Sequence, residues 1–181
     1  MRWIWLDRIV ELEPKQRLVA VKSVSAAEDV LHHRFPEAPR GGPACLPHSL
    51  IIEGMAQAAG VLVGHAGAFQ EKVILAKIGA ARFTGVLAEP GYTLRFEALL
   101  ERFDSTGASA KGHVDRIDPL TSETQRLADI ELLFSHVDQN RAGLEFPEEN
   151  FVFTDQFMDL LRRFSPEAAQ PAQPVESDAS A

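Results

Sequence analysis

The longest apolar stretch of the chain covers residues 46–64. Read as a helix, its sequence LPHSLIIEGMAQAAGVLVG is apolar on nearly every side. A helix with no solvated face is expected to be enclosed by protein. The stretch is almost long enough to cross a membrane, but Glu53 and Gln57 fall near its middle, where charges are costly in lipid. We therefore predict a buried core helix and no membrane span.

Alternating and valine-rich segments predict strands on both sides of this helix. Residues 17–25 form the first, after an apolar segment at 3–12 that fits either a strand or a short helix. Four more strands are expected after the helix, at residues 73–87, 92–103, 108–117 and 126–136. Turns such as Pro90-Gly91 join them, and glycines within the first of the four indicate a bulge or bend. Because strands do not alternate with helices, the pattern predicts an α+β fold with a mostly antiparallel sheet.

Breaks in the pattern divide the rest of the chain. Residues 36–47 are rich in proline and glycine, which predicts a loop that ends with Pro47 in the first helical turn. Phe157, Leu160, Leu161 and Phe164 share one face of a predicted helix at 151–164, which packs on the body or on a partner. We expect a main domain over residues 1–140, a helical extension over 141–165 and a disordered tail over 166–181.

Composition and charge narrow the function classes. The chain of 181 residues fits one domain with an extension. Its formal charge is −8, but residues 142–181 hold eight acidic residues against two arginines, so the first 141 residues are almost neutral. A nucleic-acid-binding protein would need a concentrated basic face, which this pattern lacks. One cysteine, Cys45, excludes an internal disulfide, and the N-terminal apolar run is too short for a signal-peptide core. We expect a soluble cytoplasmic protein.

The core helix carries the first candidate for chemistry. Ser49, Glu53 and Gln57 are spaced four apart and form one polar stripe on the apolar helix. A buried carboxylate must be paired, hydrogen-bonded or neutralised. Glu53 is therefore either a functional group or a structural glutamate satisfied by its neighbours, and the helix alone favours neither.

The histidines do not form a metal-binding pattern. His65, His113 and His136 are isolated in the sequence, and the adjacent pair His32 and His33 has no further ligand at a suggestive spacing. The sequence therefore predicts no metal site.

Three segments, in the same order, resemble the 3-hydroxyacyl-[acyl-carrier-protein] dehydratases of fatty-acid synthesis, which have the hotdog fold. The segment LDRIVELEPKQRLVAVKSVS resembles the opening strands of that family. LPHSLIIEGMAQAAG resembles its central helix, and ARFTGVLAEPGYTLRFE resembles the strand–turn–strand that follows. The resemblance covers roughly residues 5–137 and implies an antiparallel sheet wrapped around one long helix.

The resemblance also implies a site. It places Glu53 at the family's catalytic glutamate and Gln57 at its helix glutamine. The family site lies between the subunits of a homodimer, or of a trimer of dimers, where a histidine of one subunit faces the glutamate of the other. The substrate arrives on the phosphopantetheine arm of acyl carrier protein, and no cofactor is required. We expect residues such as Ile51, Met55 and Phe83 to line the acyl tunnel.

The reaction needs residue types of this kind. Histidine can remove the proton next to the thioester carbonyl near neutral pH. A carboxyl group kept neutral by burial can donate a proton to the departing hydroxyl. An N–H group at a helix N-terminus can polarise the carbonyl as negative charge develops.

The histidine segment departs from the family pattern His-Phe-Pro-x-x-Pro. Here the chain reads HHRFPEAP, so that Arg34 takes the place of the histidine and His33 lies one residue earlier. Residues 40–46, between Pro39 and Pro47, include an apparent insertion of five residues, and His48 replaces a family glycine at the helix start.

We predict Glu53 and His33 as catalytic residues, and His48 and Gln57 as substrate-binding residues. Three explanations of the histidine pattern stay open. The loop brings His33 or His32 to Glu53, or His48 supplies the imidazole, or the protein binds acyl thioesters as a scaffold subunit without dehydrating them. A hotdog thioesterase is a further alternative, because helix carboxylates of that fold also hydrolyse acyl thioesters.

Overall fold

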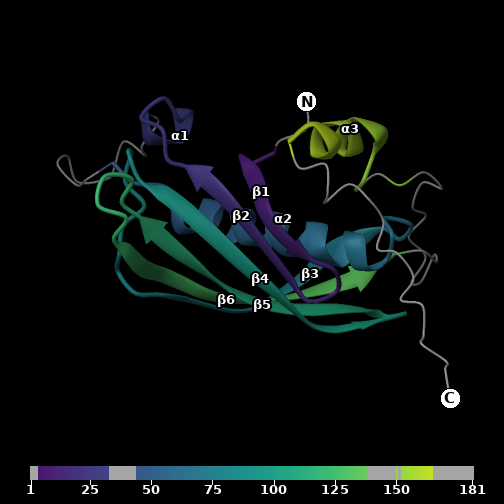
Figure 1. Ribbon diagram of the computed structural model, residues 1–181. Coiled ribbons are helices and arrows are strands. Elements are labelled where there is room, and N and C mark those ends of the chain that lie inside the picture. Colours follow the sequence, from purple (N-terminus) through teal and green to yellow (C-terminus); the bar gives the residue numbers. More distant parts are fainter. Residues whose placement is uncertain (1–3, 33–43, 138–149, 151, 165–181) are drawn as a thin grey trace, which may run out of the picture.

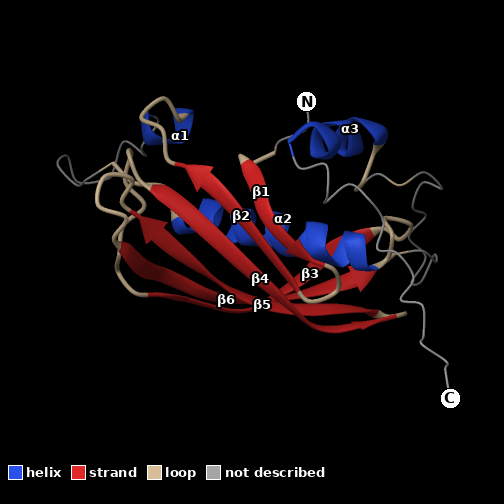
Figure 2. Cartoon of the chain, in the orientation of Figure 1, coloured by secondary structure: helices blue, strands red, loops and turns tan. Residues whose placement is uncertain are grey.

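A six-stranded antiparallel sheet curls around one long helix (Figures 1 and 2). The computed structural model describes residues 4–32, 44–137, 150 and 152–164. The strand order is β1-β2-β4-β5-β6-β3, so β1 and β3 are the two edges. The strands are β1 (Arg8–Glu13), β2 (Arg17–Ser23), β3 (Val73–Phe83), β4 (Thr93–Asp104), β5 (Gly107–Ile117) and β6 (Thr124–His136). The helices are α1 (Asp29–His32), α2 (His48–Ala66) and α3 (Asp155–Phe164).

The predicted α+β architecture is confirmed. Every pair of neighbouring strands is antiparallel. The apolar segment near the N-terminus, for which strand and helix were both open, contributes strand β1. The bend predicted in the strand after the helix is a pair of register irregularities in β3, one between Leu75 and Lys77 and one between Ile78 and Ala80. Helix α3 lies within the predicted extension, whereas the predicted tail falls outside the described residues.

Helix α2 is the core of the molecule, but it is not enclosed on every side as its sequence suggests. Its length and composition would suit a membrane span, yet 61% of its most apolar window is buried within the protein. Beyond its exposed first turn, the helix has one half-buried strip, which consists of Ile52, Glu53, Ala56, Gln57 and Gly60. Residues of both edge strands lie beside it in one cavity. The strip therefore faces the opening between β1 and β3, where the curled sheet does not close.

Two glycines of α2 differ in what surrounds them. A Cβ atom on Gly54 would lie 2.5 Å from Cζ of Phe96 and 3.1 Å from Cδ1 of Trp5. Both rings are buried, so they have no room to move aside. A Cβ atom on Gly60 would have Phe134 as its nearest neighbour, at 3.9 Å. Gly54 is therefore required for the close approach of α2 to β4, and Gly60 is not.

We expect Gly54→Ala and Gly60→Ala to change stability in opposite directions. Overpacking against Phe96 costs about 1–3 kcal/mol at Gly54. At Gly60 the better helix propensity of alanine adds up to about 1 kcal/mol. Urea unfolding followed by circular dichroism measures both free energies. Equal stability of the two variants would contradict the proposed packing.

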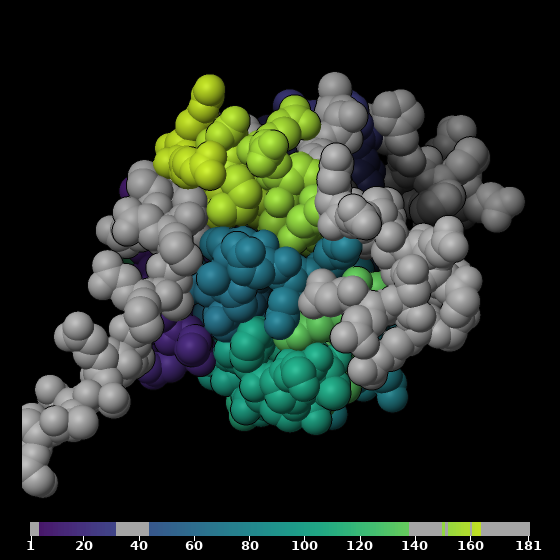
Figure 3. All heavy atoms as spheres, turned by 90° about the vertical axis from the view of Figure 1, so that its right-hand side faces the viewer, coloured from purple at the N-terminus to yellow at the C-terminus, as the bar shows by residue number. Residues whose placement is uncertain are grey.

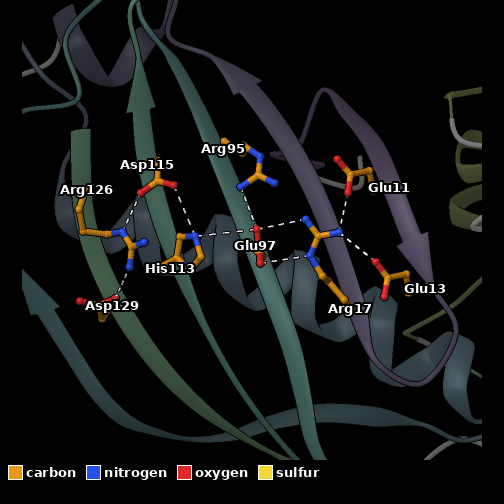
Figure 4. Close-up of polar contacts among 9 residues, drawn as sticks. All are labelled: Glu11, Glu13, Arg17, Arg95, Glu97, His113, Asp115, Arg126 and Asp129. Carbon is orange, nitrogen blue, oxygen red and sulfur yellow. Dashed lines mark hydrogen bonds and ion pairs between the residues drawn. The ribbon is translucent and has the colours of Figure 1, made fainter. Parts of the chain in front are cut away.

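A row of charged side chains crosses the outer face of the sheet (Figure 4). Glu97 on β4 is at its centre and points outward, whereas its neighbours Phe96 and Ala98 are fully buried. The Glu97 carboxylate forms ion pairs with Nε of Arg17, at 3.1 Å, and with a guanidinium nitrogen of Arg95, at 2.8 Å. The row continues through the following residues of β1, β5 and β6: Glu11, Glu13, His113, Asp115, Arg126 and Asp129.

The charge row affects the titration of its central carboxylate. The hydrogen bond from Arg17 lowers the pKa of Glu97 from 4.5 to about 2. A carboxylate whose pKa is lower in the folded state stabilises the fold above its unfolded pKa. That contribution is lost as the pH falls from about 4.5 towards about 2.

We expect Glu97→Gln to lower the free energy of unfolding at neutral pH by about 1 kcal/mol, after allowance for solvent screening. Between pH about 4.5 and about 2 the variant should lose stability less steeply than the wild type. Denaturant unfolding across this pH range measures both effects. Glu131→Gln is the matched control, because Glu131 and its ion-pair partner Arg82 are both well exposed. Parallel stability curves for wild type and Glu97→Gln would refute the interpretation.

Candidate active site

Glu53 and Gln57 lie together on the open strip of α2. Nε2 of Gln57 donates a hydrogen bond to Oε1 of Glu53 at 2.9 Å. Oε1 of Gln57 accepts a hydrogen bond from the backbone N–H of Trp5 at 2.8 Å. The structure thus brings two predicted site residues together and ties them to the segment before β1.

The contact with Trp5 determines how the Gln57 amide is oriented. A backbone N–H can only donate, so it needs the amide oxygen. The amide nitrogen then has to face Glu53, whose Oε1 accepts. A flipped amide would place two donors together at Trp5 and two acceptors together at Glu53. Gln57 therefore holds one oxygen of the Glu53 carboxyl in a fixed position.

Glu53 lines a cavity of about 270 Å³. The wall around it is mostly apolar and comes from the N-terminal segment, β1, α2, β3, β6 and α3. Asp7 and Arg8 also border this space. A polar group beside an apolar cavity suits a ligand with one reactive polar end and one hydrocarbon end.

His48 lies in a different place from Glu53. Its ring stacks on Phe83, with centroids 3.8 Å apart and an interplanar angle of 6°. It lines a second cavity of about 260 Å³, which also contains Cys45 and Ile51. Within one subunit the structure therefore does not bring His48 and Glu53 into the same cavity.

The residues expected to line the acyl tunnel do not border the Glu53 cavity. Ile51 borders the cavity of His48, and Phe83 stacks on the His48 ring. Met55 is buried between α2 and β5, within about 3.0 Å of where a Cβ atom on Gly112 would lie. Sequence reasoning instead missed Phe153, whose segment forms part of the wall.

The remaining wall residues of this segment are Val152, Phe157 and Leu161. The apolar face of the predicted C-terminal helix was the signal that could have placed Phe157 and Leu161 there. The sequence left open whether that face packs on the body, and the structure shows that it does (Figure 3).

The predicted catalytic histidine lies outside the described part of the chain. His33 and Arg34 belong to the segment 33–43, and His32 is the last residue of α1, its side chain also outside that part. Among the described histidines, His113 belongs to the charge row and His136 lies 2.6 Å from Glu71. The described residues contain no group of three or more histidine, cysteine, aspartate or glutamate side chains arranged to hold a metal ion.

Comparison with known proteins decides the family. Residues 3–115 match the FabA-like domain. The chain belongs to this FabA-like family. It is 37% identical over 143 residues to the 3-hydroxyacyl-[acyl-carrier-protein] dehydratase FabZ of Chloroflexus aggregans, a match that covers 77% of this chain and 89% of the relative. It is 36% identical over 115 residues to FabZ of Ruminiclostridium cellulolyticum, which covers 62% of this chain and 78% of the relative.

A solved structure of the same fold supports the FabA-like architecture. The dehydratase heterocomplex ApeI:P from Xenorhabdus doucetiae aligns with a TM-score of 0.57 and 19% identity, over 76% of this chain and 85% of that chain. At this identity the likeness concerns the fold alone. The family resemblance and the hotdog fold predicted from the sequence are both confirmed.

We expect Gln57→Ala to release the backbone of Trp5. The variant removes the Gln57 acceptor from the partly buried N–H of Trp5, and the loss of such a hydrogen bond costs about 0.5–1.5 kcal/mol. The amide of Trp5 should therefore exchange with solvent faster in the variant, as measured by NMR hydrogen exchange. The exposed Gln70, whose side chain donates a hydrogen bond to the nearby carbonyl of Ala68, gives the control Gln70→Ala. Unchanged protection of Trp5 in Gln57→Ala would show that the bond does not hold this segment.

Proposed function

We propose that this protein is a hydro-lyase that converts 3-hydroxyacyl-[acyl-carrier-protein] thioesters to trans-2-enoyl thioesters in fatty-acid biosynthesis. The observation that carries the proposal is Glu53, held by Gln57 at the polar side of an apolar cavity. Membership of the FabA-like family and the FabZ relatives support the reaction. Dehydration, the activity predicted from the sequence, is thus the function that these observations support best.

In the substrate the reaction breaks the C2–H and C3–O bonds and forms the C2–C3 double bond, while one proton passes to a base and another passes from a proton donor to the leaving hydroxyl. A base removes a proton from C2, the electron pair forms the C2–C3 double bond, and the C3 hydroxyl leaves as water after it receives a proton. We assign the base to His33 and the proton donor to Glu53. Gln57 fixes one oxygen of Glu53, so the carboxyl group does not have to reorient during the transfer.

The start of α2 is suited to the thioester carbonyl. Pro47 offers no side-chain hydrogen bond as a cap. The first N–H groups of a helix have no intrahelical acceptor and carry partial positive charge. We therefore assign the backbone N–H of His48 in one subunit to the carbonyl oxygen of a substrate whose C3 hydroxyl lies at Glu53 of the partner subunit, where it stabilises the enolate charge as it develops. Stacking on Phe83 keeps the His48 ring in place beside it.

The edge of the sheet supports a homodimer. β3 is an edge strand, and it exposes Leu75 (39%) and Ile78 (45%). Long apolar edge strands favour pairing with another chain. Two copies joined along β3 would bring the open strip of each α2 towards the partner, which would enclose Glu53. Three such dimers would form the larger assembly.

The carrier-protein substrate and the FabZ relatives support a cytoplasmic location.

Arg34 favours one second candidate, an acyl-thioester-binding subunit without turnover. Arginine stands where the family pattern has its histidine, and arginine is not deprotonated in proteins. Such a subunit would bind acylated carrier protein and leave its thioester unchanged. The experiment on Glu53 and His33 distinguishes the two candidates.

We expect Glu53→Gln to lower the rate of dehydration by about 10²–10⁴-fold, because the amide cannot donate the carboxyl proton. The amide still has an oxygen that accepts from Gln57, so the fold is retained. Enoyl absorbance after addition of a 3-hydroxyacyl thioester measures the rate. Glu123→Gln, at an exposed position, is the control. Complete inactivity of both the wild type and the variant would refute the dehydratase proposal and favour the acyl-thioester-binding subunit.

The same assay tests the histidine and the dimer. His33→Ala should be as inactive as Glu53→Gln, whereas His32→Ala should be active. When the His33→Ala and Glu53→Gln variants are mixed, unfolded and refolded together, activity should return. A hybrid dimer has one site in which both His33 and Glu53 are intact. No recovery would mean that His33 and Glu53 do not act across an interface.

A further inference from the structure

The C-terminal segment is built into the wall of the Glu53 cavity. Phe153 and Leu161 are buried there, and Phe157 is half-buried. Phe157 and Leu161 are four residues apart, so both point from one face of α3. Phe153 contacts Phe157 with ring centroids 5.8 Å apart and Phe69 with centroids 5.1 Å apart. The wall is therefore an aromatic cluster that joins α3 to the loop after α2.

Asn150 attaches this segment to the domain. Its Nδ2 donates to the carbonyl oxygens of Phe69 and Glu71, at 3.3 Å and 3.2 Å. Its Oδ1 accepts from the backbone N–H groups of Val152 and Phe153, at 3.0 Å and 2.9 Å. One side chain thus connects the loop between α2 and β3 with the start of the wall.

The wall lies at the opposite end of the cavity from the carboxyl group. A Cβ atom on Gly64 would collide with the Phe153 ring, so Phe153 packs directly on α2 at that position. Gly64 follows Glu53 by eleven residues, which corresponds to about 16 Å along a helix. Between them α2 lines the cavity with Ala56, Gln57, Gly60 and Val61.

We propose that α3 forms the end wall of the acyl-chain cavity and limits the length of acyl chain that the enzyme accepts. The inference rests on the proposed function, because it places the reacting carbons of the substrate at Glu53. The hydrocarbon tail then follows α2 past Gly60 and ends against Phe157 and Leu161. Short and medium acyl chains fit within this space, and long chains meet the wall.

The test compares acyl carrier proteins loaded with 3-hydroxybutyryl, 3-hydroxyoctanoyl and 3-hydroxypalmitoyl groups. Wild type should have a much lower kcat/KM for palmitoyl than for octanoyl chains. Phe157→Ala and Leu161→Ala should raise the palmitoyl-to-octanoyl ratio about tenfold or more, because they deepen the cavity. Gly60→Leu should lower the octanoyl-to-butyryl ratio by a similar factor, because it narrows the cavity.

Two further variants separate specificity from stability. Gln156→Ala removes an exposed side chain of the same helix and should leave both ratios unchanged. Asn150→Asp keeps the acceptor for Val152 and Phe153 but loses the donor to Phe69 and Glu71. It should raise the palmitoyl-to-octanoyl ratio although every cavity-lining residue is intact. Folded Phe157→Ala, Leu161→Ala and Asn150→Asp proteins with wild-type ratios would overturn the proposal, as would an equal loss for all three chains.

Failure of the proposed function would give a different result. Wild type would then turn over none of the three substrates. The wall is in that case tested by the Kd of saturated butyryl, octanoyl and palmitoyl pantetheine thioesters, measured by calorimetry. The same variants should shift these Kd ratios in the opposite directions to the kcat/KM ratios, because tighter binding lowers Kd, and unchanged Kd ratios would overturn the inference.

Discussion

The enclosure of an apolar helix by a sheet that does not close is the constraint on which this structure depends. Helix α2 is too apolar to be stable in water, so the sheet has to curl around it. The six strands end at β1 on one side and β3 on the other, and the gap between them exposes one strip of the helix. The polar residues that an enclosed helix could not tolerate, Glu53 and Gln57, lie on that strip. The position of the site therefore follows from where the sheet stops.

The gap is bordered by elements with different tasks. The segment before β1 supplies the backbone N–H of Trp5, which orients Gln57 and through it Glu53. The edge strand β3 supplies exposed apolar side chains suited to a second subunit. Helix α3 covers the far end of the strip with aromatic and aliphatic side chains. In our proposals, chemistry, assembly and substrate length therefore each depend on a different border of this opening.

The fold was accessible from the sequence because the signals were local. Valine-rich alternation marked the strands, and the uniformly apolar stretch marked α2. The polar stripe also predicted that Glu53 and Gln57 would meet, because residues four apart on a helix are neighbours. The separation of His48 from Glu53 follows from their spacing, because residues five apart on a helix point about 140° apart. The stacking of His48 on Phe83 was not accessible, because it is a contact between α2 and a strand. The place of Phe153 depends on Asn150 and on Gly64, which are far apart in the sequence. His33 stays a prediction, since it lies outside the described residues.

The row of charges on the outer face has a consequence for how the strands find their partners. Glu97 lies opposite Val19 on β2 and His113 on β5, and this alignment places its carboxylate 3.1 Å from Nε of Arg17. A slip by one residue would turn Glu97 towards the apolar core and bring Phe96 or Ala98 to the surface. Misaligned pairing would thus bury a charge and separate it from Arg17 at once. The row therefore discriminates against incorrect strand alignments during folding, in addition to holding the finished sheet together.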